Sequence, residues 1–123
     1  MRFLFLILIC FGLLLCSLRA MIHPVTTIAS ELNQCDELEY EEKTPIYKLC
    51  LEIDHLKDNL TPMERNQKVR NLKYYLKKFE TKIKDHYGED QFDDEGNSIK
   101  AMVGQERQIR DITARISAEI DKL

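Results

Sequence analysis

Apolar residues recur at steps of three and four along most of this chain, and that spacing constrains its fold more than any other feature. One such series is formed by Ile46, Leu49, Ile53, Leu56 and Leu60. This spacing places apolar side chains on one face of an α-helix. No alternating strand pattern of useful length accompanies it. The sequence therefore predicts an all-α fold, a small helical bundle.

Local turn signals divide the apolar pattern into four helices. The pairs Thr44-Pro45 and Thr61-Pro62 each offer a capping hydroxyl followed by a first-turn proline, and Gly88 suits a left-handed helix stop. Ser98 can cap the last helix. The predicted helices cover residues 26–42, 45–60, 62–87 and 98–122, with an acidic loop over 88–97. The expected core comprises Leu49, Ile53, Leu72, Leu76, Phe79, Ile109, Ile112 and Ile116.

The first twenty residues predict a secretory signal peptide. Arg2 precedes a nearly unbroken apolar run from Phe3 to Leu15, and Ala20 ends a plausible cleavage region. The run of about 13 residues is shorter than the roughly 20 needed to span a bilayer. We therefore expect a signal peptide at 1–20, a single helical domain at 21–123, a secreted and extracellular location, and no transmembrane span in the mature chain.

Cleavage after Ala20 would leave two of the four cysteines, Cys35 and Cys50. Two cysteines in an oxidising compartment favour one disulfide bond. With a turn near residue 43, both cysteines would lie about 11 to 12 Å from the turn on antiparallel helices. The sequence therefore predicts a disulfide that clips the first two helices into an αα-hairpin, with the last two forming a longer pair. The spacing leaves open whether that pair packs on the hairpin as a four-helix bundle or projects from it.

Charge alternates strongly along the chain. Residues 21–61 hold three basic and nine acidic residues, residues 62–87 hold eight basic and three acidic, and residues 88–123 hold five basic and nine acidic. The basic third helix is a candidate face for an anionic partner such as a sulfated glycan, an acidic protein or an anionic surface. Its candidate residues are Lys73, Lys77, Lys78 and Lys82. The alternative is that these lysines only balance the acidic helices.

Two further motifs bear on modification and metal binding. Asn59-Leu60-Thr61 is an N-glycosylation sequon, although Pro62 directly after it disfavours modification. The acidic run Asp90–Asn97 resembles a calcium loop in composition. Its register fails, because Gly96 at the sixth position would put Gln91 at the first and Met102 at the twelfth.

The sequence predicts no catalytic site, no metal site and no cofactor. None of the serines lies in a nucleophile elbow, and no glycine-rich phosphate loop or paired histidine motif is present. Export and the acidic total disfavour nucleic acid as a partner.

The leading hypothesis is a secreted, non-enzymatic interaction protein. It would act as an extracellular ligand or humoral factor that binds a receptor or other protein through exposed helical faces, as a monomer or weak helical dimer. The alternatives are a carrier of a hydrophobic small molecule held between the apolar faces, and a self-associating structural helical protein.

Overall fold

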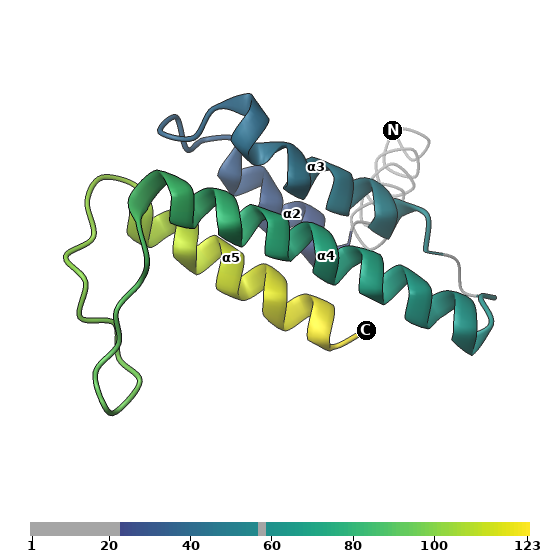
Figure 1. Cartoon of the computed structure of the whole chain (residues 1–123). Helices are drawn as coiled ribbons and strands as arrows, with labels where there is room; N and C mark the ends of the chain where they lie inside the picture. The colour runs from purple at the N-terminus through teal and green to yellow at the C-terminus, as the bar shows by residue number, and fades with distance from the viewer. Residues whose placement is uncertain (1–22, 57–58) are drawn as a thin grey trace, which may run out of the picture.

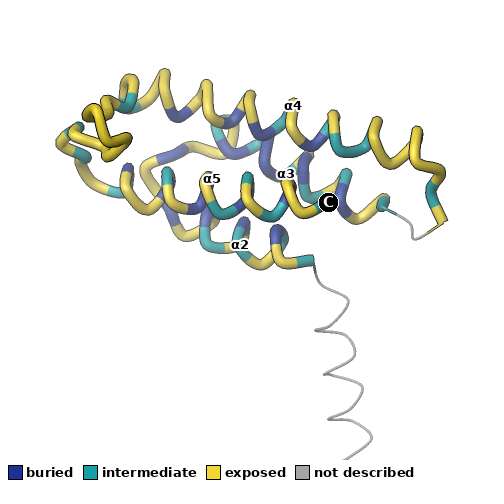
Figure 2. Tube along the Cα trace, turned by 90° about the horizontal axis from the view of Figure 1, so that it is seen from below, coloured by how far each residue is buried: buried dark blue, intermediate teal, exposed yellow. Residues whose placement is uncertain are grey.

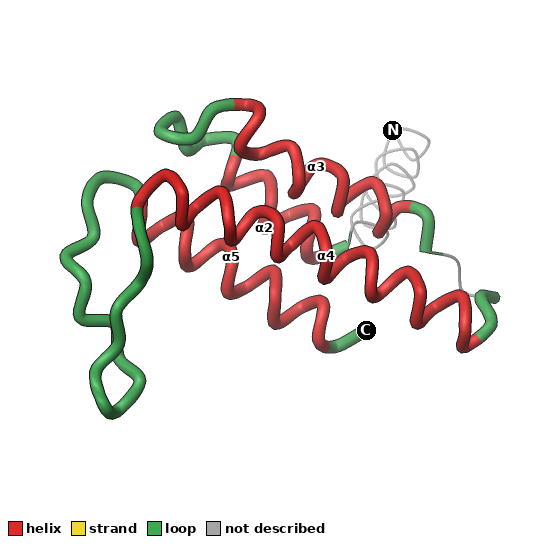
Figure 3. The backbone as a smooth tube through the Cα atoms, in the orientation of Figure 1, coloured by secondary structure: helices red, strands yellow, loops and turns green. Residues whose placement is uncertain are grey.

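The computed structural model describes residues 23–56 and 59–123, which form four α-helices (Figures 1 and 3). These are α2 (Pro24–Leu32), α3 (Tyr40–Asp54), α4 (Pro62–Tyr87) and α5 (Glu106–Asp121). The predicted all-α class is confirmed. The predicted signal peptide at 1–20 lies outside the described residues.

The four helices pack around one apolar core. Each helix contacts two others, in the cyclic order α2, α3, α4, α5 and back to α2. Figure 2 shows the buried positions on the inward sides of the helices. None of the helices in the described residues is long and apolar enough to cross a membrane. All eight predicted core residues are buried, namely Leu49, Ile53, Leu72, Leu76, Phe79, Ile109, Ile112 and Ile116.

Helix α4 begins and ends where the sequence predicts. The hydroxyl of Thr61 accepts a hydrogen bond from the backbone N–H of Glu64 at 3.2 Å, which satisfies one of the free donors at the helix start. Gly88 follows the last residue with a φ of 89°, a conformation that costs glycine little. Local signals are strong at both ends, so the predicted and observed bounds agree.

The predicted boundary between the first two helices is wrong. Helix α2 ends at Leu32, and α3 already begins at Tyr40, so Thr44 and Pro45 lie inside α3. The hydroxyl of Thr44 donates to the backbone oxygen of Tyr40 at 3.0 Å instead of capping a helix. The start of α3 is set by Glu42, whose carboxylate accepts from the backbone N–H of Glu39 at 3.1 Å.

The predicted start of the last helix is also wrong. Helix α5 begins at Glu106, eight residues after Ser98. Ser98 instead forms an antiparallel bridge with Phe92, and its hydroxyl donates to the carboxylate of Asp90 at 2.7 Å. The acidic loop therefore extends over residues 88–105 (Figure 3).

Cys35 and Cys50 are free thiols, so the predicted disulfide is absent from the structure. The Cys35 thiol donates to the backbone oxygen of Glu31 at 3.7 Å, near the end of α2. Burial raises the pKa of the Cys50 thiol, and Thr26 in the first turn of α2 partly offsets this rise.

The bounds of α2 and α3 explain why the cysteines are not level. Burial raises the pKa of the Cys35 thiol, and Cys35 lies in the connection between the two helices. Cys50 lies ten residues after Tyr40, the first residue of α3, or roughly 15 Å along that helix. Disulfide-bonded residues have Cα atoms within about 7 Å. The error arose from the expected turn near residue 43, which lies inside α3.

We expect two free thiols of unequal reactivity in the folded protein. Cys35 is fully buried and Cys50 is half-buried, so alkylation under native conditions should modify Cys50 first. Mass spectrometry after timed alkylation measures this order. A peptide in which Cys35 is linked to Cys50 would contradict the free thiols of the structure.

Phe79 tests the core directly, because its side chain is fully buried near the middle of α4. Phe79→Ala should lower the free energy of unfolding by about 3 to 5 kcal/mol, measured by urea denaturation. Phe92→Ala is the matched control. Phe92 is 60% exposed, so its truncation should change stability by less than about 0.5 kcal/mol. Equal losses for the two variants would place the core elsewhere.

Candidate functional site

A groove between α3 and α4 is the candidate binding site. It has a volume of about 360 Å³. Helix α3 contributes one wall and α4 the other, because the two helices pack side by side along their buried faces. The residues that line the groove are Glu41, Thr44, Pro45 and Lys48 from α3, and Tyr75, Lys78, Thr81, Lys82 and Asp85 from α4.

Three exposed lysines give the groove its positive charge. Lys48, Lys78 and Lys82 line it, and none of them forms an ion pair with another described residue. Two carboxylates, Glu41 and Asp85, line the same groove. The lining therefore offers separated charges of both signs with a net positive balance, and its lysines are free to pair with an incoming carboxylate.

Apolar and aromatic surface lies among these charges. Pro45 is buried beneath the groove, and Tyr75 is half-buried at its wall. The ring of Tyr75 stands edge-on to that of Tyr74, with centroids 5.5 Å apart. The ammonium of Lys78 lies 5.0 Å from the centroid of the Tyr74 ring, a cation–π distance. The groove can thus contact an apolar side chain and a negative charge together.

The structure divides the predicted four-lysine face. Lys78 and Lys82 line the groove, whereas Lys73 and Lys77 do not. Residues five apart on a helix, such as Lys73 and Lys78, point about 140° away from each other. The four lysines therefore belong to two different sides of α4, and only one side faces the groove.

Several other charges at the helix interfaces form ion pairs within the chain. Lys68 of α4 pairs with Glu52 of α3 at 3.2 Å, and His86 contacts Glu42 at 2.9 Å. Arg115 of α5 pairs with Glu31 of α2. These contacts support in part the alternative that the basic helix balances acidic neighbours, but the groove lysines take no part in them.

The loop between α4 and α5 carries a short hairpin over residues 91–99. The backbone N–H of Ile99 donates to the oxygen of Gln91 at 2.8 Å, and that of Asp93 donates to the oxygen of Asn97 at 2.8 Å. The carboxylate of Asp93 accepts from the backbone N–H of Asn97, also at 2.8 Å. The acidic side chain of Asp93 therefore stabilises the turn in which it lies.

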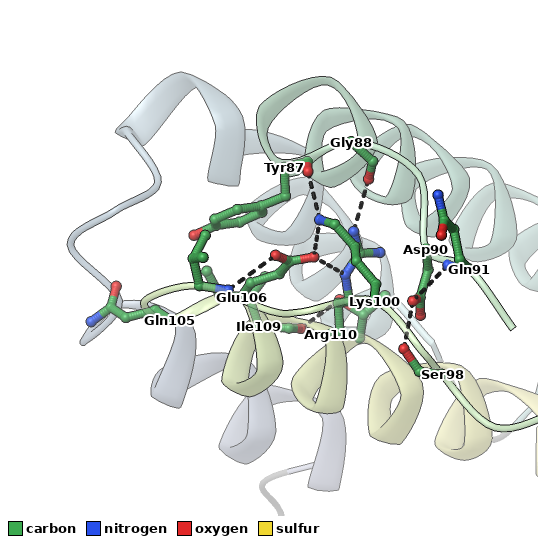
Figure 4. Close-up of polar contacts among 12 residues, drawn as sticks. Tyr87, Gly88, Asp90, Gln91, Ser98, Lys100, Gln105, Glu106, Ile109 and Arg110 are labelled. Atoms are coloured by element: carbon green, nitrogen blue, oxygen red, sulfur yellow. Dashed lines mark hydrogen bonds and ion pairs between the residues drawn. The ribbon is translucent and has the colours of Figure 1, made fainter.

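A buried carboxylate, Glu106, holds this loop to the bundle (Figure 4). Its side chain is fully buried and pairs with Lys100 at 2.6 Å and with Arg110 at 2.9 Å. Lys100 also donates to the backbone oxygen of Tyr87, and Arg110 to that of Gly88. The two cations thereby satisfy free backbone oxygens at the end of α4.

The protonation of Glu106 follows from these contacts. Burial alone would raise the pKa of this carboxyl, but the hydrogen bonds from Lys100 and Arg110 outweigh burial and hold the pKa below its usual range. Glu106 is therefore ionised near neutral pH, and its pairing stabilises the folded state.

Glu37 makes a second anchor for the same loop. Its carboxylate accepts from the hydroxyl of Tyr87 and from the backbone N–H of Gln105, and these bonds lower the pKa of Glu37. Gly104 allows the carboxylate of Glu37 to lie close to the backbone, because a Cβ at position 104 would lie 1.8 Å from a carboxylate oxygen of Glu37. The connection between α2 and α3 is thus tied to the start of α5.

The sequon asparagine, Asn59, is exposed between α3 and α4, an accessible position for modification. The described residues contain no group of three or more His, Cys, Asp or Glu side chains that could hold a metal ion. In particular, the acidic residues of the hairpin do not converge.

Sequence reasoning missed several residues that matter here. Lys48 and Tyr75 join the groove only through the register of α3 against α4, which no local pattern reports. Glu106 lies between polar neighbours and resembles a surface acid in the sequence. The only sequence feature that pointed to this part of the structure was Gly104, a glycine just before an apolar helical series.

Comparisons with models of known protein families, with curated proteins and with solved structures find no match for this chain.

The Glu106 cluster can be tested by removing its charge. Glu106→Gln leaves Lys100 and Arg110, which are 20% and 19% exposed, without an anionic partner. We expect a loss of about 2 to 3 kcal/mol in the free energy of unfolding, less than for a wholly buried pair because both cations reach solvent. Glu119→Gln, which removes a surface pair with Lys122, should cost less than about 1 kcal/mol.

The same cluster predicts a pH dependence. Because the folded-state pKa of Glu106 is lowered, its stabilising contribution is present above the unfolded-state pKa of about 4.3 and is lost as pH falls through the folded value. Urea denaturation between neutral and acidic pH should therefore show a weaker acid destabilisation in Glu106→Gln than in the wild type. Identical pH profiles would contradict the assigned protonation of Glu106.

Proposed function

We propose that this chain is a secreted, non-enzymatic interaction protein that binds an acidic segment of another extracellular protein in the α3–α4 groove. The observation that carries the proposal is the set of three groove lysines with no ion-pair partner among the described residues. Lys68 and Arg115, at other helix interfaces, are paired within the chain. Lys73 and Lys77 also form no ion pair with a described residue, but they lie outside the groove.

The composition of the groove favours a protein segment over a sulfated glycan. Glu41 and Asp85 lie among the lysines, and Tyr75 and Pro45 add apolar surface. A densely sulfated chain would bring anions against both carboxylates. A peptide with a few acids, an apolar side chain and free backbone groups can place each feature against a complementary one.

The groove is a poor site for a hydrophobic small molecule. Five of its nine lining residues are charged, and an apolar ligand would remove water from them without replacing their hydrogen bonds. The hydroxyls of Thr44 and Thr81 each donate to a backbone oxygen of their own helix. This arrangement gives neither hydroxyl an activating base, which supports binding over catalysis.

Secretion is part of the proposal and rests on residues 1–20. A charged start, an apolar run and a small residue at Ala20 are typical of a signal peptide. An extracellular receptor or other extracellular protein is then the class of partner that the groove would meet.

Charge reversal on the two sides of α4 tests the proposal. Lys78→Glu/Lys82→Glu changes the groove, and Lys73→Glu/Lys77→Glu makes the same change in charge on the same helix outside it. We expect the groove variant to lose capture of extracellular partners at least about tenfold, as truncation of close charge pairs does. The control variant should retain capture close to the wild type, with its normal salt dependence.

The readout is quantitative mass spectrometry of proteins captured from extracellular fluid by wild type and both variants, with circular dichroism to verify folding. Equal loss of capture in the two variants would show that net charge, and not the groove, controls binding. Unchanged capture by a folded groove variant would contradict the proposal.

A further inference from the structure

The 91–99 hairpin carries exposed apolar side chains on its two arms and exposed acidic side chains at its turn. Phe92 is 60% exposed and Ile99 is 61% exposed. The carboxylates of Asp94 and Glu95 are exposed and accept no hydrogen bond from any described residue. By contrast, Asp90 and Asp93 are used within the loop itself. Asp94 and Glu95 are therefore free to pair with cations of another molecule.

The hairpin is held in shape before any partner arrives. Its two arms are joined by backbone hydrogen bonds, and Gly96 at its turn donates to the backbone oxygen of Asp93 at 3.0 Å. The Glu106 cluster fixes the base of the loop to the end of α4. Binding of a partner to the hairpin would therefore cost little conformational entropy of the hairpin.

The chain carries both halves of a complementary contact. The hairpin offers an exposed Phe92 on one arm and two free carboxylates at its turn, and the α3–α4 groove offers Tyr75 and Pro45 among free lysines. In Figure 1 the hairpin projects from one end of the bundle on the side away from α3. The two features of one chain therefore face different neighbours.

We propose that the hairpin of one copy docks in the α3–α4 groove of a second copy, an inference that rests on the proposed function of the groove as a binding site. Phe92 would lie against Tyr75, while Asp94 and Glu95 would pair with Lys78 and Lys82. Each docked pair leaves one groove and one hairpin free, so copies add head to tail. Self-association would then compete with the extracellular partner for the groove.

The expected association is weak and sensitive to salt. A groove of about 360 Å³ accommodates only a few side chains, so we expect the contact to bury less than the roughly 1,200 Å² at the lower end of stable interfaces. The paired charges are exposed at the groove, so added salt screens them. The protein is thus monomeric when dilute and associates as its concentration rises.

Sedimentation equilibrium of the folded protein lacking residues 1–20 tests this arrangement with two variants. The groove variant is Lys78→Glu/Lys82→Glu, and the hairpin variant is Asp94→Lys/Glu95→Lys. Wild-type average mass should rise with concentration, and each variant alone should associate at least about tenfold more weakly. Lys73→Glu/Lys77→Glu, the matched control, should associate like the wild type.

Mixing the two variants gives the sharpest result. The acidic hairpin of the groove variant complements the lysine groove of the hairpin variant, and the two charge-reversed surfaces complement each other. The mixture should therefore associate about as strongly as the wild type, although each variant alone associates weakly. Circular dichroism on every variant separates a lost contact from a lost fold.

Three results would overturn the inference. The first is a wild type that stays monomeric to the limit of its solubility. The second is association that neither variant weakens, which would place the contact on another surface. The third is association weakened by the groove variant alone, which would assign the groove to a different segment or protein. If capture of extracellular partners still depends on Lys78 and Lys82, the proposed function stands in each case.

Discussion

The buried apolar side of α4 is the constraint on which the rest of the structure depends. Leu72, Leu76, Phe79 and Ile83 are buried along this helix, which lies between α3 and α5 in the bundle. Burial of these residues fixes the rotation of α4 about its axis. That rotation places Lys78 and Lys82 beside α3 and directs Lys73 and Lys77 elsewhere. The candidate site is therefore a consequence of core packing, since no local motif specifies it.

The polar cluster around Glu106 fixes the position of the loop that follows α4. Glu106 is buried because two cations and a backbone N–H satisfy its oxygens, and the same cations bond the last carbonyls of α4. A buried carboxylate without those partners would cost several kcal/mol. The loop is thus anchored at its base while the 91–99 hairpin stays exposed. Core packing and this cluster together set the positions of the groove and the hairpin.

The sequence predicts the fold well where the signals are local. Thr61 and Gly88 mark the ends of α4, and both bounds agree with the structure. Prediction failed over residues 33–39, because Cys35 and Leu38 are buried in a connection and continue the helical spacing of α2. Prediction failed again at Ser98, which pairs with Phe92 in a hairpin instead of capping a helix. The groove depends on the register of two helices, so the sequence indicated two of its three lysines and added two that lie outside it.

The central claim is that partners bind between α3 and α4, and site-specific photo-crosslinking tests it most directly. A photo-reactive residue at Thr81 lies in the groove, and one at Lys73 lies on the same helix outside it. In extracellular fluid, the groove position should crosslink to acidic segments, either of another protein or of the 91–99 hairpin of a second copy, and position 73 should not. Equal crosslinking from the two positions, or crosslinks from position 73 alone, would contradict the account.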